Sequence, residues 1–253
     1  MYKTIKISLI ILKSIFIVVL FLFTIVFTSA GILNKKVTNE LNEFIEKAEF
    51  EYQVDNIKYY AVYTDKHIDD TIIRNYNDDN DELAPTLGNV GDIFIMPQSR
   101  IDYVPLLKDF ITYLAGGHAG MIVDNNMLVE SMGGTQKESY VFMAPTDLFH
   151  EERNVIGLRV KAPKEDRIIA SEYAKTLVGK RYSYFYLWDT KNKYYCTNIC
   201  SRSYGKEAKL NYELDSNGFI CKTQDLILSK QTYITFVKIV KGDIIEIYYL
   251  KGK

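Results

Sequence analysis

The sequence predicts an α+β protein built on one antiparallel sheet, with helices packed against one face of that sheet. Three observations support this prediction. Short runs rich in β-branched and aromatic residues are bounded by turn residues over most of the chain, and segments with apolar residues at helical spacing lie between them. An uncharged apolar stretch near the N-terminus adds a membrane-spanning or signal helix ahead of the folded part.

The apolar stretch predicts a membrane segment with a defined orientation. Residues 14–33 contain no charged residue, Lys3, Lys6 and Lys13 precede them, and the first acidic residue is Glu40. Positive charge remains on the cytoplasmic side of a membrane, so the rest of the chain is expected to be extracytoplasmic.

Two fates are open for this segment. Small residues at positions 28–30 offer a signal-peptidase site, and cleavage after Ala30 would give a secreted protein. The apolar stretch is nevertheless long enough to cross a bilayer and exceeds the usual core of a signal peptide. The length favours a retained single-pass anchor in the cell membrane.

Three regions are predicted: an anchor or signal peptide (1–33), an N-terminal extension (34–85) and a catalytic domain (86–253). Within the extension, residues 34–50 have apolar residues at helical spacing and predict a helix that lifts the domain off the membrane. Residues 57–64 alternate like a strand. The acidic segment after them is expected to form a surface loop or short helix; it lacks the alternating ligands and the glycine of a calcium loop. The apolar positions of the predicted helix are Val37, Leu41, Phe44, Ile45 and Ala48.

The catalytic domain is expected to alternate strands with helices. Helix 164–179 is predicted to stop at Gly179 and to bury one apolar face. The residues of that face are Ile168, Ile169, Tyr173, Ala174 and Leu177. The expected elements, in order, are a strand (90–96), a helix (104–114), two strands around a turn at 124–126, a helical turn (144–149), a strand (154–161), helix 164–179, a helix opening at Cys196, a short helix (225–230) and two closing strands (233–240 and 243–250).

A cysteine, a histidine and a glutamate form the candidate catalytic set. Cys196 opens a predicted helix, where the helix N-terminus favours a thiolate. His118 begins a predicted strand among small residues, and an imidazole can take the thiol proton and return it to a leaving group. Glu130 lies across the predicted turn and can orient the imidazole. These residue types together are typical of a cysteine hydrolase or acyltransferase.

The same residues also allow structural and metal-binding interpretations. Taken singly, a histidine at a strand start is usually a polar end cap, a helical cysteine is usually a core residue, and Glu130 could be an edge charge. Zinc bound by Cys196, Cys200 and His118 would lack a convincing fourth ligand, so no metal and no cofactor are expected. His67 and His150 are expected on the surface.

Composition limits the partners and the redox state. The chain has 31 basic and 32 acidic residues with no long basic run, so no nucleic-acid partner is expected. The chain has three cysteines, and at least one of them must be unpaired. Three free thiols are favoured; a disulfide between Cys200 and Cys221 is the alternative.

The run from Gly91 to Gly205 resembles the NlpC/P60 papain-like superfamily in its circularly permuted branch, the YiiX/YaeF-like group related to lecithin retinol acyltransferase. The likeness rests on GDIFIM, HAGMIV, the glutamate twelve residues after the histidine, GKRYSY, and YYCTN opening a helix. The histidine precedes the cysteine, as the permuted branch requires. The chain departs from the branch at Thr197-Asn198, where a serine and an acidic residue are common.

The resemblance implies a papain-like fold with Cys196 as nucleophile, His118 as general base and acid, and Glu130 as the third member. The Cys196 backbone amide would contribute to the oxyanion hole, and further oxyanion or substrate contacts are Tyr182, Tyr195 and Thr197. The implied activity is extracytoplasmic hydrolysis of an amide or ester bond in a peptide or lipid-acyl substrate of the cell envelope. An acyltransferase with the same site, or an inactive binding module of this fold, is the alternative.

Overall fold

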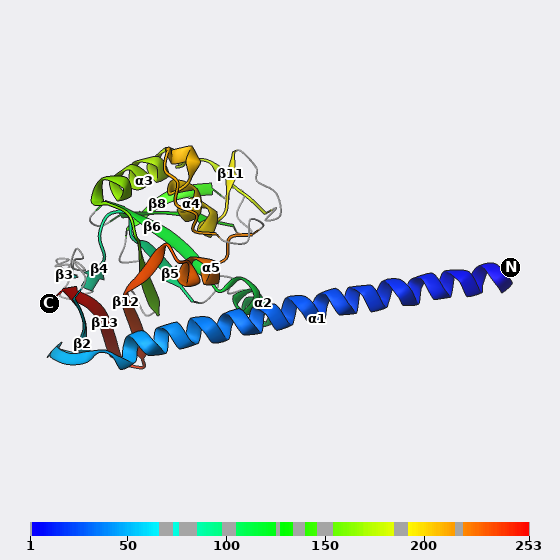
Figure 1. Ribbon diagram of the computed structural model, residues 1–253, viewed down its shortest axis with the longest axis horizontal. Coiled ribbons are helices and arrows are strands. Elements are labelled where there is room, and N and C mark those ends of the chain that lie inside the picture. Colours follow the sequence, from blue (N-terminus) through cyan, green and yellow to red (C-terminus); the bar gives the residue numbers. More distant parts are fainter. Residues whose placement is uncertain are drawn as a thin grey trace.

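The computed structural model describes residues 2–65, 73–75, 85–97, 105–124, 127–133, 140–145, 154–184, 192–215 and 220–252. Over these residues the protein is α+β, with one 11-stranded sheet, five α-helices and a separate two-stranded sheet. The first helix extends far beyond the folded part, as Figure 1 shows. The helices are α1 (Tyr2–Glu46), α2 (Pro105–Ala115), α3 (Lys164–Thr176), α4 (Cys196–Ser203) and α5 (Thr223–Leu228), with a short 3-10 helix at Lys206–Ala208.

Helix α1 runs without a break through the apolar stretch and the predicted extension helix. Its N-terminal part is apolar and exposed from Ile10 to Val26, and the helix as a whole is long and apolar enough to cross a membrane or to serve as a signal sequence. Its C-terminal part is half-buried at the predicted spacing, and Val37 and Leu41 pack against the core. The apolar face of this part is covered by the domain itself.

The large sheet has the strand order β1-β2-β13-β12-β9-β5-β6-β7-β8-β10-β11. It is mixed, which corrects the expected antiparallel sheet: β2 is parallel to β13, and β10 is parallel to β11. A parallel pair needs a long crossover, and most of the chain lies between β2 and β13. The strands are β1 (Glu49–Val54), β2 (Ile57–Thr64), β5 (Ile93–Met96), β6 (His118–Asp124), β7 (Met127–Met132), β8 (Tyr140–Pro145), β9 (Val155–Val160), β10 (Arg181–Tyr182), β11 (Lys193–Tyr194), β12 (Thr232–Lys241) and β13 (Ile244–Gly252), with β3 (Ile73–Asn75) and β4 (Pro85–Leu87) in the small sheet.

Several strands differ from the sequence prediction. The helical turn expected at 144–149 was wrong at its start, because Ala144 and Pro145 end β8; residues 146–149 lie outside the described residues. Strand β1 begins within the segment predicted as helix, and β2 pairs with β13, so the predicted extension shares the main sheet.

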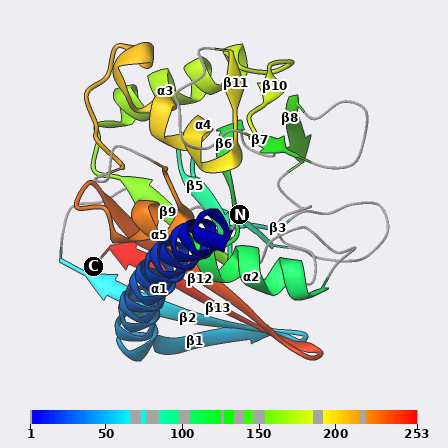
Figure 2. The ribbon, with the colours of Figure 1, turned by 90° about the vertical axis from the view of Figure 1, so that its right-hand side faces the viewer.

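Apolar side chains fill both faces of the central strands. In β5, Ile93 and Ile95 join a cluster beneath α3 and α4, whereas Phe94 and Met96 join a second cluster on the opposite face. Figures 1 and 2 show α3 and α4 together over one part of the sheet, with α1 and α2 at another edge.

Helix α3 buries part of the predicted face. Ala174 and Leu177 are buried and Tyr173 packs against the core, as predicted, but Ile168 and Ile169 are 43% and 46% exposed. Arg167, Ala170 and Ser171 are buried as well, and the small side chains of Ala170 and Ser171 allow close approach of the helix to the sheet.

Candidate active site

His118 and Glu130 meet on one face of the β6–β7 pair. The strands are antiparallel, with Gly120 opposite Glu130. Because His118 lies two residues from Gly120, both side chains project from the same face, and Gly120 offers no side chain to separate them. The His118 Nε2 atom lies 2.6 Å from Glu130 Oε2; the glutamate is fully buried and the histidine is nearly so.

Two glycines lead from α2 into the histidine. Gly116 and Gly117 adopt positive φ angles of 78° and 112°, a region that glycine enters without steric cost. A Cβ atom at Gly116 would lie 2.1 Å from the Thr223 hydroxyl oxygen, and that hydroxyl donates a hydrogen bond to the carbonyl oxygen of Ala115. This packing fixes the point at which β6 begins.

Cys196 is the first residue of α4, after Tyr195 in an extended conformation. Ile199 and Cys200 hold the helix in the core cluster that includes Ala119 and Met121 of β6. Cys196 as a whole residue is partly buried. The start of this helix is therefore held against the strand that carries His118.

The charges of Cys196 and His118 are coupled. Burial opposes ionisation of the thiol, but the His118 charge, a hydrogen bond from His118 and the backbone amides of Ala119 and Thr197 together lower the Cys196 pKa. Burial also opposes protonation of the imidazole, but Cys196 and Glu130 raise the His118 pKa. Since Nε2 faces Glu130, Nδ1 is the nitrogen left to face the sulfur. This arrangement favours a thiolate–imidazolium pair.

The neighbouring site candidates have distinct positions. The Thr197 hydroxyl donates to the Cys221 carbonyl oxygen (2.6 Å), and the buried Tyr195 hydroxyl accepts from the Cys221 amide (3.1 Å). Both side chains thus hold the segment at Cys221, while Thr197 reaches the sulfur through its backbone amide. The half-buried Tyr182 ring packs over Gly133, just past the end of β7, and contacts the Tyr184 ring.

Two groups near the sulfur were not predicted from the sequence. One is the Ala119 backbone amide, which leaves no mark in a sequence because every residue except proline has it. The other is Ser131, whose buried hydroxyl donates to the Tyr194 carbonyl oxygen (2.8 Å) and so fixes the chain two residues before Cys196. The sequence signal that could have identified Ser131 is its position next to the candidate Glu130.

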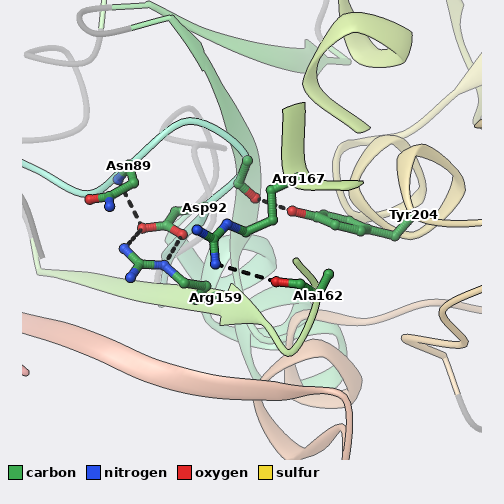
Figure 3. Close-up of polar contacts among 7 residues, drawn as sticks. Asn89, Asp92, Arg159, Ala162, Arg167 and Tyr204 are labelled. Carbon is green, nitrogen blue, oxygen red and sulfur yellow. Dashed lines mark hydrogen bonds and ion pairs between the residues drawn. The ribbon is translucent and has the colours of Figure 1, made fainter. Parts of the chain in front are cut away.

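A buried ion pair supports the elements around the site. Asp92 accepts hydrogen bonds from Arg159 Nε (2.7 Å) and a second guanidinium nitrogen (2.8 Å), and also from the Asn89 amide. Figure 3 shows this pair beside Tyr204, whose hydroxyl donates to the Gly91 carbonyl oxygen (2.7 Å). Tyr204 follows the last residue of α4, so this contact ties α4 to the segment just before β5.

The remaining predictions concern thiols and metals. Cys196, Cys200 and Cys221 are all free thiols. Within the described ranges, no three His, Cys, Asp or Glu side chains are placed to hold a metal ion. His67 and His150 lie outside the described residues.

A large groove of about 870 Å³ is lined by α1, α5 and the ends of β9 and β12, and its lining includes none of Cys196, His118 and Glu130.

Comparison of the chain with protein-family models, curated proteins and solved structures finds no match.

Proposed function

We propose that the protein is an extracytoplasmic cysteine hydrolase of the permuted NlpC/P60 type, with Cys196, His118 and Glu130 as its catalytic residues. One observation carries the proposal: a thiol with a lowered pKa hydrogen-bonds to an imidazole whose other nitrogen lies 2.6 Å from a buried carboxylate. A structural cysteine in an apolar core has a raised pKa instead, as Cys200 does. The resemblance in motif order supports the papain-like reading of the fold.

In the proposed reaction, the Cys196 thiolate attacks the carbonyl carbon of an amide or ester, and a bond forms between sulfur and carbon. The Ala119 and Thr197 backbone amides hydrogen-bond to the sulfur and stabilise the thiolate before the attack. His118 then donates its proton to the leaving amine or alcohol as the carbon–nitrogen or carbon–oxygen bond breaks. Water attacks the thioester and gives a proton to His118, and the sulfur–carbon bond breaks to release the acid and restore the Cys196 thiolate beside the imidazolium.

Glu130 has an electrostatic and orienting role in this scheme. Its carboxylate fixes which imidazole nitrogen faces the sulfur and stabilises the imidazolium before the proton is transferred. Full burial strengthens this interaction, because water does not screen it. The proposed substrate is a peptide, amide or lipid-acyl component of the cell envelope, since α1 can hold the domain at a membrane.

The acyl-enzyme is the species that tests this proposal. Full-length protein should be incubated with N-acyl peptides, γ-glutamyl amides and acyl esters, quenched in acid and mapped by mass spectrometry. We expect a substrate class that adds its acyl mass to the peptide containing Cys196, and loss of that mass on treatment with hydroxylamine. Transfer of the label to an added amine or alcohol in preference to water would identify an acyltransferase. Absence of any adduct across all classes would favour a binding module.

A further inference from the structure

We infer that α2 seats the folded domain on a lipid bilayer, with the aromatic surface at Phe27 and Phe110 at the level of the lipid headgroups. The inference rests on the proposed membrane anchoring by α1 and goes beyond it, because an anchor alone leaves a domain free to move away from the bilayer. Three features of the chain lead to it: the α1–α2 contacts, the length of free helix and the place of α2 before His118.

Helices α1 and α2 are joined where the exposed part of α1 ends. Phe27 stacks on Tyr113 with ring centroids 5.4 Å apart, and the Phe110 ring lies 5.6 Å from Phe27. The Tyr113 hydroxyl donates to the Phe27 carbonyl oxygen (2.9 Å). Two turns further along α1, the Asn34 side chain donates to the Tyr113 carbonyl oxygen (3.0 Å). These contacts hold α2 beside α1, as Figures 1 and 2 show.

The contact extends from α2 into the domain. The Asn34 and Gln224 side-chain amides lie 2.9 Å apart, and Gln224 is the second residue of α5. Ala30, on the same face of α1, is only 1% exposed. Helix α1 is therefore packed against the domain from Phe27 onward, with no linker between the apolar segment and the folded part.

The free apolar segment is too short to cross a bilayer by itself. Between Lys13 and Phe27 about 13 residues are available, which span roughly 20 Å as a helix. The hydrocarbon core is about 30 Å thick and needs about 20 residues. Either the uncharged residues after Phe27 enter the core, or the residues before Lys13 do and its ammonium group reaches back to the surface. In the first arrangement α2, which packs beside Phe27, enters the headgroup layer. In the second arrangement α2 lies on the surface of that layer.

The surface of α2 suits that position. Phe110 is 38% exposed beside the half-buried Phe27, so an aromatic pair faces outward at the depth where the membrane boundary falls. Tyr113 lies next to them with its hydroxyl bonded to the backbone. Aromatic residues are common at membrane–water boundaries, where their apolar rings and polar edges are both accommodated.

The contact of α2 with the bilayer, which we call the seat, also sets the position of the candidate site. Helix α2 ends at Ala115, three residues before His118, and three residues span at most about 11 Å. A domain held by α2 therefore keeps His118 near the bilayer surface, together with the Cys196 thiol that hydrogen-bonds to it. This favours a substrate whose scissile bond is itself presented at that surface, as opposed to one diffusing freely.

Fluorescence quenching by brominated lipid tests the seat. The only tryptophan, Trp188, is replaced by phenylalanine in the full-length chain, and one new tryptophan is introduced in each of three variants. Phe110→Trp reports on the seat and Val19→Trp on the anchor. Ile169→Trp is the matched control on exposed α3, which Figure 1 shows away from the free part of α1. Each is reconstituted in vesicles of dioleoylphosphatidylcholine and phosphatidylglycerol, with or without phosphatidylcholine brominated near the headgroup end of the acyl chain.

We expect brominated lipid to quench Val19→Trp and Phe110→Trp, the latter at least about twofold more than Ile169→Trp. Quenching of Val19→Trp alone would overturn the seat and leave the anchor intact. Failure to quench Val19→Trp would overturn both. Equal quenching of all three would also contradict a seat made by α2. Acyl-enzyme formation is a separate readout, so the proposed chemistry can fail independently of these results.

Discussion

Replacing Cys196 by alanine is expected to lower kcat by roughly 10⁴-fold or more on any substrate that forms the acyl-enzyme. Cys196 is the only one of the three cysteines that is partly exposed as a residue, and its pKa is lowered by His118 and two backbone amides. Alanine leaves the helix start and these backbone amides in place, so the loss would report on the nucleophile and not on folding. Steady-state hydrolysis by the purified full-length variant measures it.

Cys200→Ala is the matched control. Cys200 lies one helical turn further along α4, is fully buried, and has a pKa raised by burial. It also loses a sulfur to alanine, yet kcat should stay within about threefold of the parent protein, because no reacting group is removed. Equal losses in the two variants would mean that the chemistry does not pass through Cys196.

Asp92→Ala is expected to destabilise the fold by about 3–5 kcal/mol, because it takes the Asp92 carboxylate away from a buried, charged Arg159 guanidinium. Both side chains are fully buried, and two hydrogen bonds join them. The variant also frees the Asn89 amide that bonds to the carboxylate. For a domain of this size the loss corresponds to a decrease in Tm of roughly 6–20 °C. Thermal unfolding of the full chain in detergent, followed by circular dichroism, measures it.

Two controls make this result specific. Glu172→Ala removes an exposed ion pair with Lys175, so Tm should hardly change. The double variant Asp92→Leu with Arg159→Met removes both buried charges together and should recover much of the loss. A single Asp92→Ala variant as stable as Glu172→Ala would contradict a structural role for the pair.

Local pattern predicted much of the site before the structure. The turn at 124–126 predicted two strands with His118 and Glu130 facing each other, and strict side-chain alternation then fixed a common face. The small residues around His118 and the helix opening at Cys196 were also visible in the sequence. These features depend on neighbours within a few residues, or on one hairpin.

Long-range pairing could not be predicted from the sequence. No local signal shows that β2 runs parallel to β13, or that Ser131 holds the Tyr194 carbonyl oxygen, because each contact joins segments far apart in the chain. On α3, the prediction rested on hydrophobicity alone and placed Ile168 and Ile169 on the buried face. In the structure, smaller residues pack against the sheet and these two are exposed.

The coupling of Cys196 with His118 is the central claim, and the rate of Cys196 alkylation against pH tests it most directly. Iodoacetamide reacts with the thiolate, so the rate should rise through a pKa below the free-cysteine value of about 8.5. In His118→Ala the imidazolium and its hydrogen bond are lost while burial remains, so the titration should move to higher pH and alkylation at pH 7 should fall. Glu130→Gln removes a group that raises the His118 pKa and should give a smaller shift in the same direction. A titration near 8.5 that neither substitution moves would contradict the account.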